Sequence, residues 1–219
     1  MRRWLCMLVP LALLSGCNVG SIGLKVTSKI NATYDSASAD VGVTIQVVVD
    51  YEECALGGCR VHASGGRVRA GVPGKPLVAL SEISTGVFEG YDSYSTEYAI
   101  EVEARGDHMS GSVALPGLHR VTLSPDPPVV GGPLEVRWSP SNEGVSVGVS
   151  AHETSSSSSP GTCSSDNTAG CDDDGAEQLA ASYFPTAGDY QISVQRSSDR
   201  SGAIRCTSHL TATLRRAVK

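Results

Sequence analysis

One serine, Ser146, stands in the G-x-S-x-G pattern of hydrolase nucleophiles, within the run Gly144-Val145-Ser146-Val147-Gly148. That pattern supplies a nucleophile only where a strand bends sharply into a helix and exposes the hydroxyl. Here valines alternate through the motif and Val149 continues the alternation, so we expect Ser146 to lie on the face of a strand. The pattern therefore does not predict a nucleophile elbow.

A second serine, Ser110, lies close to Asp107 and His108, but neighbours within one turn rarely point at one another. The histidines form no H-x-H or H-E-x-x-H pair that would indicate a metal or catalytic site. They are scattered along the chain: His62, His108, His119, His152 and His209. We therefore expect a protein that is not an enzyme, and a serine hydrolase of the cell envelope using Ser146 or Ser110 is the alternative.

The densest acidic cluster comprises Asp166, Asp172, Asp173, Asp174 and Glu177. Carboxylate oxygens are the ligands that Ca²⁺ prefers. When Gly175 is aligned with the glycine of an EF-hand loop, however, Gly170 occupies the place of the first acidic ligand, so that loop is excluded. We expect a solvated loop with no metal and no cofactor, and a calcium-dependent surface adhesin using Asp172, Asp173 and Asp174 is a further alternative.

Aromatic residues gather between positions 88 and 98, namely Phe88, Tyr91, Tyr94 and Tyr98. Tyr98 begins an alternating run and is expected in the core. Tyr91 and Tyr94 are expected on a loop, where exposed aromatic rings contact sugars or protein partners. The chain as a whole has a formal net charge of −6 and 5% aromatic residues, which argues against nucleic-acid binding.

The N-terminal segment has the features of an export signal. Arg2 and Arg3 precede an apolar run, Trp4 to Leu14, that is shorter than the roughly 20 residues of a membrane-spanning helix. It ends in Leu14-Ser15-Gly16-Cys17, which resembles the lipobox of bacterial type II signal peptides. That resemblance implies removal of residues 1–16, lipidation of Cys17 with palmitate-type chains and a tether over residues 17–23. Asn18 in place of Asp implies anchoring in the outer membrane.

Export to an oxidising compartment favours disulfides among the remaining cysteines. Cys54 and Cys59 flank a short turn with two glycines, so we expect them to pair, although this spacing is also that of half a zinc site. Cys163, Cys171 and Cys206 cannot all pair with one another. Two of the three are expected to form a disulfide, and the sequence does not choose which two.

Two strand-like runs share one construction. Tyr98 to Glu103 alternates apolar and polar residues, and Tyr190 to Gln195 does the same 190 − 98 = 92 residues later. Gly- and Pro-rich turns separate further short alternating runs, and no long helical period is present. This pattern predicts an all-β protein built from sandwiches.

The run Thr186-Ala187-Gly188-Asp189-Tyr190 resembles the turn before strand F of immunoglobulin-like and fibronectin type III-like domains. The resemblance implies that the hydroxyl of Tyr190 bonds back to the chain, with Tyr98 as a weaker counterpart. It also implies that Trp138 packs between the sheets, whereas an exposed Trp138 would stack on a ligand. We expect two tandem immunoglobulin-like β-sandwich domains, over residues 24–117 and 118–219.

These observations predict a lipid-anchored, non-catalytic protein of the outer membrane. We expect it to act as a binding or structural module for an envelope protein or a glycan. Its position on the outside or the periplasmic side of that membrane is left open.

Overall fold

Alternating apolar and polar residues form β-strands over most of the described chain in the computed structural model. The structure describes all residues except 1–22, 37–40, 54–58, 144 and 156–171. Within this part of the chain, the only helical element is a short 3-10 turn, η1 (Ala181–Tyr183). None of the described residues forms a helix long and apolar enough to cross a membrane. The predicted all-β sandwich class is therefore confirmed.

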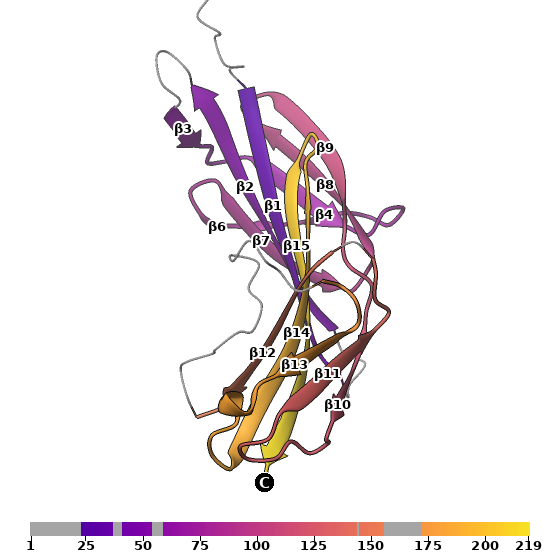
Figure 1. Ribbon diagram of the computed structural model, residues 1–219. Coiled ribbons are helices and arrows are strands. Elements are labelled where there is room, and N and C mark those ends of the chain that lie inside the picture. The colour runs from indigo at the N-terminus through magenta and orange to yellow at the C-terminus, as the bar shows by residue number, and fades with distance from the viewer. Residues whose placement is uncertain (1–22, 37–40, 54–58, 144, 156–171) are drawn as a thin grey trace, which may run out of the picture.

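One large sheet runs the length of the molecule (Figure 1). Its neighbouring strands, in order, are β12 (Ser146–Glu153), β14 (Gly188–Arg200), β15 (Arg205–Val218), β1 (Gly23–Asp35), β2 (Val41–Glu53), β7 (Val87–Ser93) and β6 (Ser81–Ser84), with β3 (Cys59–His62) also paired to β2. All these pairs are antiparallel except β1 and β15, which run parallel from Thr27 beside Arg205 to Asp35 beside Thr213. The first and last strands of the described chain therefore lie side by side.

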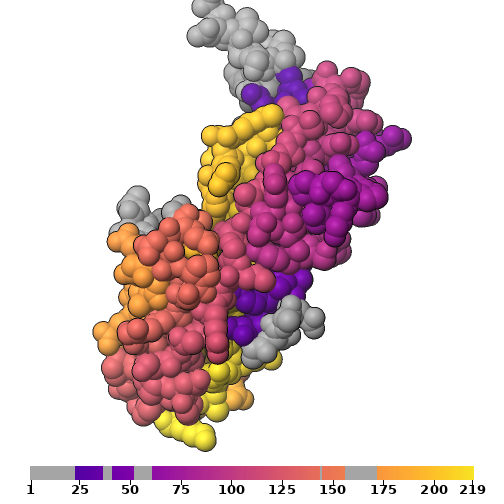
Figure 2. Space-filling view, turned by 90° about the vertical axis from the view of Figure 1, so that its right-hand side faces the viewer, coloured from indigo at the N-terminus to yellow at the C-terminus, as the bar shows by residue number. Residues whose placement is uncertain are grey.

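Two smaller sheets cover the inner face of the large sheet, one towards each end (Figures 1 and 2). The first has the order β5 (Val78–Ala79), β4 (Arg67–Gly71), β8 (Glu97–Ala104) and β9 (Asp107–Ala114). The second has the order β10 (Arg120–Ser124), β11 (Leu134–Ser139) and β13 (Ala176–Leu179). The runs predicted at 98–103 and 190–195 are parts of β8 and β14.

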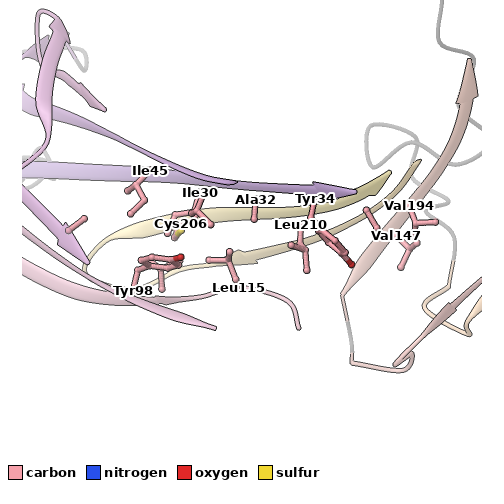
Figure 3. Close-up of a cluster of buried hydrophobic side chains, with 14 of the residues drawn as sticks. Ile30, Ala32, Tyr34, Ile45, Tyr98, Leu115, Val147, Val194, Cys206 and Leu210 are labelled. Atoms are coloured by element: carbon pink, nitrogen blue, oxygen red, sulfur yellow. The ribbon is translucent and has the colours of Figure 1, made fainter. Parts of the chain in front are cut away.

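The buried side chains form one continuous hydrophobic cluster along the inner face of the large sheet. Figure 3 shows Ile30, Ala32 and Tyr34 following one another along β1, with Leu115 and Leu210 beside them. Strands β14, β15 and β1 extend beneath both smaller sheets. The large sheet therefore pairs β1, from the domain expected at 24–117, with β15, from the domain expected at 118–219. The division at residue 117 stays a prediction.

Both predicted tyrosine corners are present as hydrogen bonds. The Tyr190 hydroxyl donates to the Thr186 carbonyl at 3.2 Å. The Tyr98 hydroxyl donates to the Ser93 carbonyl at 2.5 Å and accepts from the Ser95 N–H at 2.9 Å, so the expected weaker corner makes two backbone bonds. Each tyrosine is buried at the start of its strand and fixes the turn that precedes it.

Candidate binding surface

The outer face of the large sheet, opposite the hydrophobic core, carries mainly hydroxyl and amide side chains. Alternate residues of a strand point to opposite faces, so each strand that places Val or Ile in the core presents its intervening residues on the outer side. On β15 the intervening residues are Thr207, His209, Thr211 and Thr213; on β14 they include Gln191, Ser193, Gln195 and Ser197. The outer face is thus a continuous hydrophilic surface over several strands.

Strand register aligns six of these residues in one line across the sheet, which we name the polar row. The pairs Ser146–Ser197, Ser197–His209, His209–Asn31, Asn31–Thr44 and Thr44–Tyr91 are each direct cross-strand neighbours. Neighbouring strands lie about 4.8 Å apart, so the row extends about 24 Å from β12 to β7. It brings together residues that are up to 178 positions apart in the chain, since 209 − 31 = 178.

His209 lies near the centre of the polar row and is held by two neighbours on β14. Its Nδ1 lies 2.8 Å from the amide nitrogen of Gln195 and 2.8 Å from the hydroxyl of Ser197. An amide nitrogen can only donate, so Nδ1 accepts and the ring proton is on Nε2. Burial lowers the pKa of His209, and the positive charge of Lys29 lowers it further. The ring is therefore neutral near pH 7 and offers Nε2–H as a donor.

Two shallow hollows lie on the same outer face. One, of about 290 Å³, is lined by residues of three adjacent strands, among them Lys29, Gln46 and His209. The other, of about 550 Å³, lies towards the far end of β14 and β15, where His152, Gln191 and Arg215 are among its lining residues. The outer face thus has two recesses that a small polar group can enter.

The two tyrosines predicted as ligand contacts have different surroundings. Tyr91 lies within strand β7, so its expected place on a loop is wrong. It is 75% exposed at the β7 end of the polar row, and its hydroxyl donates to Glu89 Oε1 at 3.1 Å. Tyr94 is half-buried, and its hydroxyl donates to the Pro116 carbonyl at 2.9 Å. Tyr91 therefore has a ring free to contact a ligand, whereas Tyr94 fastens the chain between β9 and β10.

The acidic residues predicted as a weak calcium site do not converge. Asp173 is turned inward, where its Oδ1 accepts from Trp138 Nε1 at 2.9 Å and its Oδ2 contacts Arg196 at 2.7 Å. Asp172 is exposed, and Asp174 accepts from the N–H of Ala176 at 3.2 Å. Among the described residues, no three His, Cys, Asp or Glu side chains are grouped to hold a metal ion. Trp138 is 3% exposed, so it packs between the sheets as expected.

The two serines weighed as nucleophiles both lie on strands. Ser146 is the first residue of β12 and Ser110 is in the middle of β9, and both are exposed. Asp107 accepts from the Tyr51 hydroxyl at 2.9 Å, and His108 is the cross-strand neighbour of Glu103. The structure instead brings Ser197 beside His209 on the outer face, a pair that sequence reasoning missed. Ser197 lies beyond the predicted run Tyr190 to Gln195, and only the strand register places it beside His209.

Most of the predicted covalent sites lie outside the described residues: Cys17, Cys54, Cys163 and Cys171. Of Cys59 the structure describes the backbone, at the start of β3. Cys206 is a buried free thiol at the start of β15. The choice among Cys163, Cys171 and Cys206 for a second disulfide stays a prediction.

Neither a scan against protein-family models nor a search of curated proteins finds a match to the chain.

Proposed function

We propose that the chain is a lipid-anchored protein of the bacterial outer membrane that acts as a non-catalytic binding module for envelope or surface glycans. The anchor is the lipidated Cys17 implied by the lipobox. The binding surface is the outer face of the large sheet. The observation that carries the proposal is the polar row, in which side chains from six strands form one continuous line.

The chemistry of this surface favours a glycan over a protein partner. Protein interfaces have a buried apolar centre that aromatic and aliphatic anchors fill. The polar row has hydroxyl, amide and imidazole groups in its centre and one exposed ring, Tyr91, at its end. Sugars present hydroxyl groups that such side chains bond and apolar C–H faces that a tyrosine ring covers.

Lipid anchoring is tested by metabolic labelling with an alkyne palmitate in a diderm host. We expect label on the wild-type chain and on Cys6→Ala, the matched control, and no label on Cys17→Ala. Persistent labelling of Cys17→Ala would contradict the anchor. Protease shaving of intact and permeabilised cells then assigns the side of the membrane.

Glycan binding is tested by crosslinking the anchored chain in cells and analysing the co-purified material for carbohydrate and protein. We expect carbohydrate above the level recovered with an unrelated lipoprotein. Recovery of no envelope component would refute the proposed binding function.

A serine hydrolase is the second candidate, because the Ser197 hydroxyl lies 2.8 Å from His209 Nδ1. A nucleophile also needs a group that orients the histidine and donors for the oxyanion. A fluorophosphonate probe separates the two functions: labelling that is lost in Ser197→Ala or in Ser146→Ala would favour the hydrolase. We expect no labelling.

A further inference from the structure

The polar row and the line of residues next to it carry no formal charge. The adjacent line contains, in each strand, the residue two positions from the one in the polar row. Its members are Gly148, Gln195, Thr211, Thr33, Gly42 and Ser93. Across these two lines there is no acid, no lysine or arginine, and no aliphatic side chain. A surface of this kind pairs with a ligand that is itself uncharged and rich in hydroxyl groups, because neither partner then loses the hydration of an ion.

Charges on the other side of the polar row alternate in sign. In register order they are Asp199, Lys29 and Glu89, separated by Thr207 and Gln46. Anionic polymers are bound by clusters of Arg and Lys, which single alternating charges do not provide. The charges nearest the polar row are thus complementary to a neutral chain and not to an acidic one.

Tyr91 gives the row an apolar contact at one end. Its ring is exposed while its hydroxyl is held by Glu89, so the ring is restrained against the sheet without being covered. An aromatic ring buries a large apolar area when a flat C–H surface stacks on it. Next to Tyr91 in the row, Thr44 and Asn31 supply a hydroxyl and an amide.

Donors and acceptors then continue along the row. Asn31 has two donors and a carbonyl acceptor, and His209 beside it offers Nε2–H while its Nδ1 is occupied by β14. These groups are spaced one strand apart and span about 24 Å. That span fits a chain of several sugar units, whereas a single sugar would contact only two or three neighbouring strands.

We infer that the polar row binds a linear, uncharged polysaccharide that lies across the strands of the large sheet, stacks on Tyr91 and bonds to Asn31 and His209. This inference rests on the proposed glycan-binding function and specifies its ligand class and its contacts. The ligand crosses β1 and β15 where they run parallel, so a contiguous site exists only when these two strands pair.

The test uses the full chain in detergent and affinity electrophoresis in gels containing one soluble polysaccharide each. The neutral probes are dextran, laminarin, galactomannan and xyloglucan, and the acidic probe is alginate. We expect retardation by at least one neutral probe and none by alginate. Retardation by alginate alone, or by none of the five, overturns the inference.

Variants assign the binding to the polar row. Tyr91→Ala is expected to weaken binding about tenfold, the effect of about 1.4 kcal/mol, whereas Tyr91→Phe keeps the ring and binds within about twofold of wild type. Asn31→Ala and His209→Ala are expected to weaken binding several-fold. The matched controls are His108→Ala and Ser110→Ala, both on β9 of the opposite layer.

Equal binding by wild type, Tyr91→Ala, Asn31→Ala and His209→Ala would overturn the inference. Unchanged far-UV spectra verify that each variant is folded. The failure of this inference is distinct from failure of the proposed function: if cells still yield a crosslinked envelope glycan but the row variants bind it fully, only the inference is wrong.

Discussion

Arg196 and Asp173 form a buried ion pair, with 2.7 Å between the guanidinium Nη2 and the carboxylate Oδ2. The arginine side chain is fully buried although it belongs to β14, and its Nη1 also contacts Glu143 at 3.0 Å. Burial by itself raises the pKa of Asp173, but hydrogen bonds from Trp138, Arg196 and the N–H of Glu143 outweigh it and hold the pKa below its usual value. This pair joins β14 to the segments around Glu143 and Asp173.

Removing one member of the pair should be strongly destabilising. Arg196→Met leaves the Asp173 carboxylate buried without its counter-ion, and we expect the free energy of unfolding to fall by about 3–5 kcal/mol. Urea denaturation measures the change. The control is Arg205→Met, whose partner Asp199 is exposed and whose loss should cost less than about 1 kcal/mol. Equal effects of the two substitutions would show that the buried pair does not stabilise the fold.

His119 should make stability depend on pH in the range from neutral to weakly acidic. It is 2% exposed, and burial together with the charge of Arg196 lowers its pKa to about 4. Asp173 acts in the opposite direction, as do the hydrogen bonds of the ring to the backbone, but less strongly. The folded state thus binds a proton less readily than the unfolded state, where the pKa is near 6.5. The part of the stability that depends on a neutral His119 is therefore fully present above pH 6.5, and it is lost as the pH falls from 6.5 towards 4.

Between pH 7 and pH 5 we expect the protonation of His119 to lower the free energy of unfolding by about 2 kcal/mol. The loss is about 1.36 kcal/mol for each pH unit below 6.5. Urea denaturation at the two pH values measures this loss. His119→Gln retains a donor for the Val194 carbonyl and cannot titrate, so its stability should change much less over the same range. The exposed His108→Gln serves as the control and should behave like wild type. A pH dependence unchanged in His119→Gln would exclude His119 as its source.

The two tyrosine corners should differ in strength. Tyr98→Phe removes a bond to the Ser93 carbonyl and one from the Ser95 N–H, and we expect a loss of about 1–3 kcal/mol. Tyr190→Phe removes one longer backbone bond and should cost about 1 kcal/mol. Thermal and urea unfolding report both changes, with the exposed Tyr91→Phe as the control. A larger loss for Tyr190→Phe than for Tyr98→Phe would reverse the order that the geometry predicts.

Sequence periodicity predicted the strands and the faces of their side chains, because alternation in a strand is a local property. It placed Tyr98 and Tyr190 in the core, and the resemblance to immunoglobulin-like domains placed Trp138 there; the structure has all three buried. It did not predict which strands are neighbours. Asn31 and His209 are far apart in the chain and meet only through the parallel pairing of β1 with β15, so the polar row could not be found from either strand alone.

The inward turn of Asp173 was hidden for a related reason. Acidic residues in a loop are normally solvated, and only a buried cation changes this. Arg196 provides that cation. It faces inward because it comes two positions after Val194 and so continues the inward-facing series Tyr190, Ile192 and Val194 of β14. A charged residue at the end of an apolar series is not recognised from the sequence as part of that series. Tyr91 and Tyr94 could not be distinguished either, since the Pro116 carbonyl that holds Tyr94 belongs to another segment.

The thiol of Cys206 should be unreactive in the native protein. It is 3% exposed, and burial raises its pKa, so both access and the thiolate fraction are low. We expect iodoacetamide to modify Cys206 only after denaturation. Peptide mapping without reduction should then show disulfides between Cys54 and Cys59 and between Cys163 and Cys171. A peptide that links Cys206 to Cys163 or Cys171 would contradict the free thiol.

The two halves of the chain should not fold separately. A fragment that ends at residue 117 lacks β15, the parallel partner of β1 along Thr27 to Asp35. A fragment that begins at residue 118 exposes Ile204 and Cys206, which are buried in the full chain; Ile204 lies beside Gly111 of β9. We expect each fragment alone to lack a cooperative unfolding transition. An equimolar mixture should recover one, because β1 and β15 then pair and cover the apolar surface of each fragment.

The control is the intact chain cleaved at an engineered site near residue 117, which should retain its structure. Cooperative unfolding of either fragment alone would establish it as an independent domain and would support the division at residue 117 that the sequence predicts.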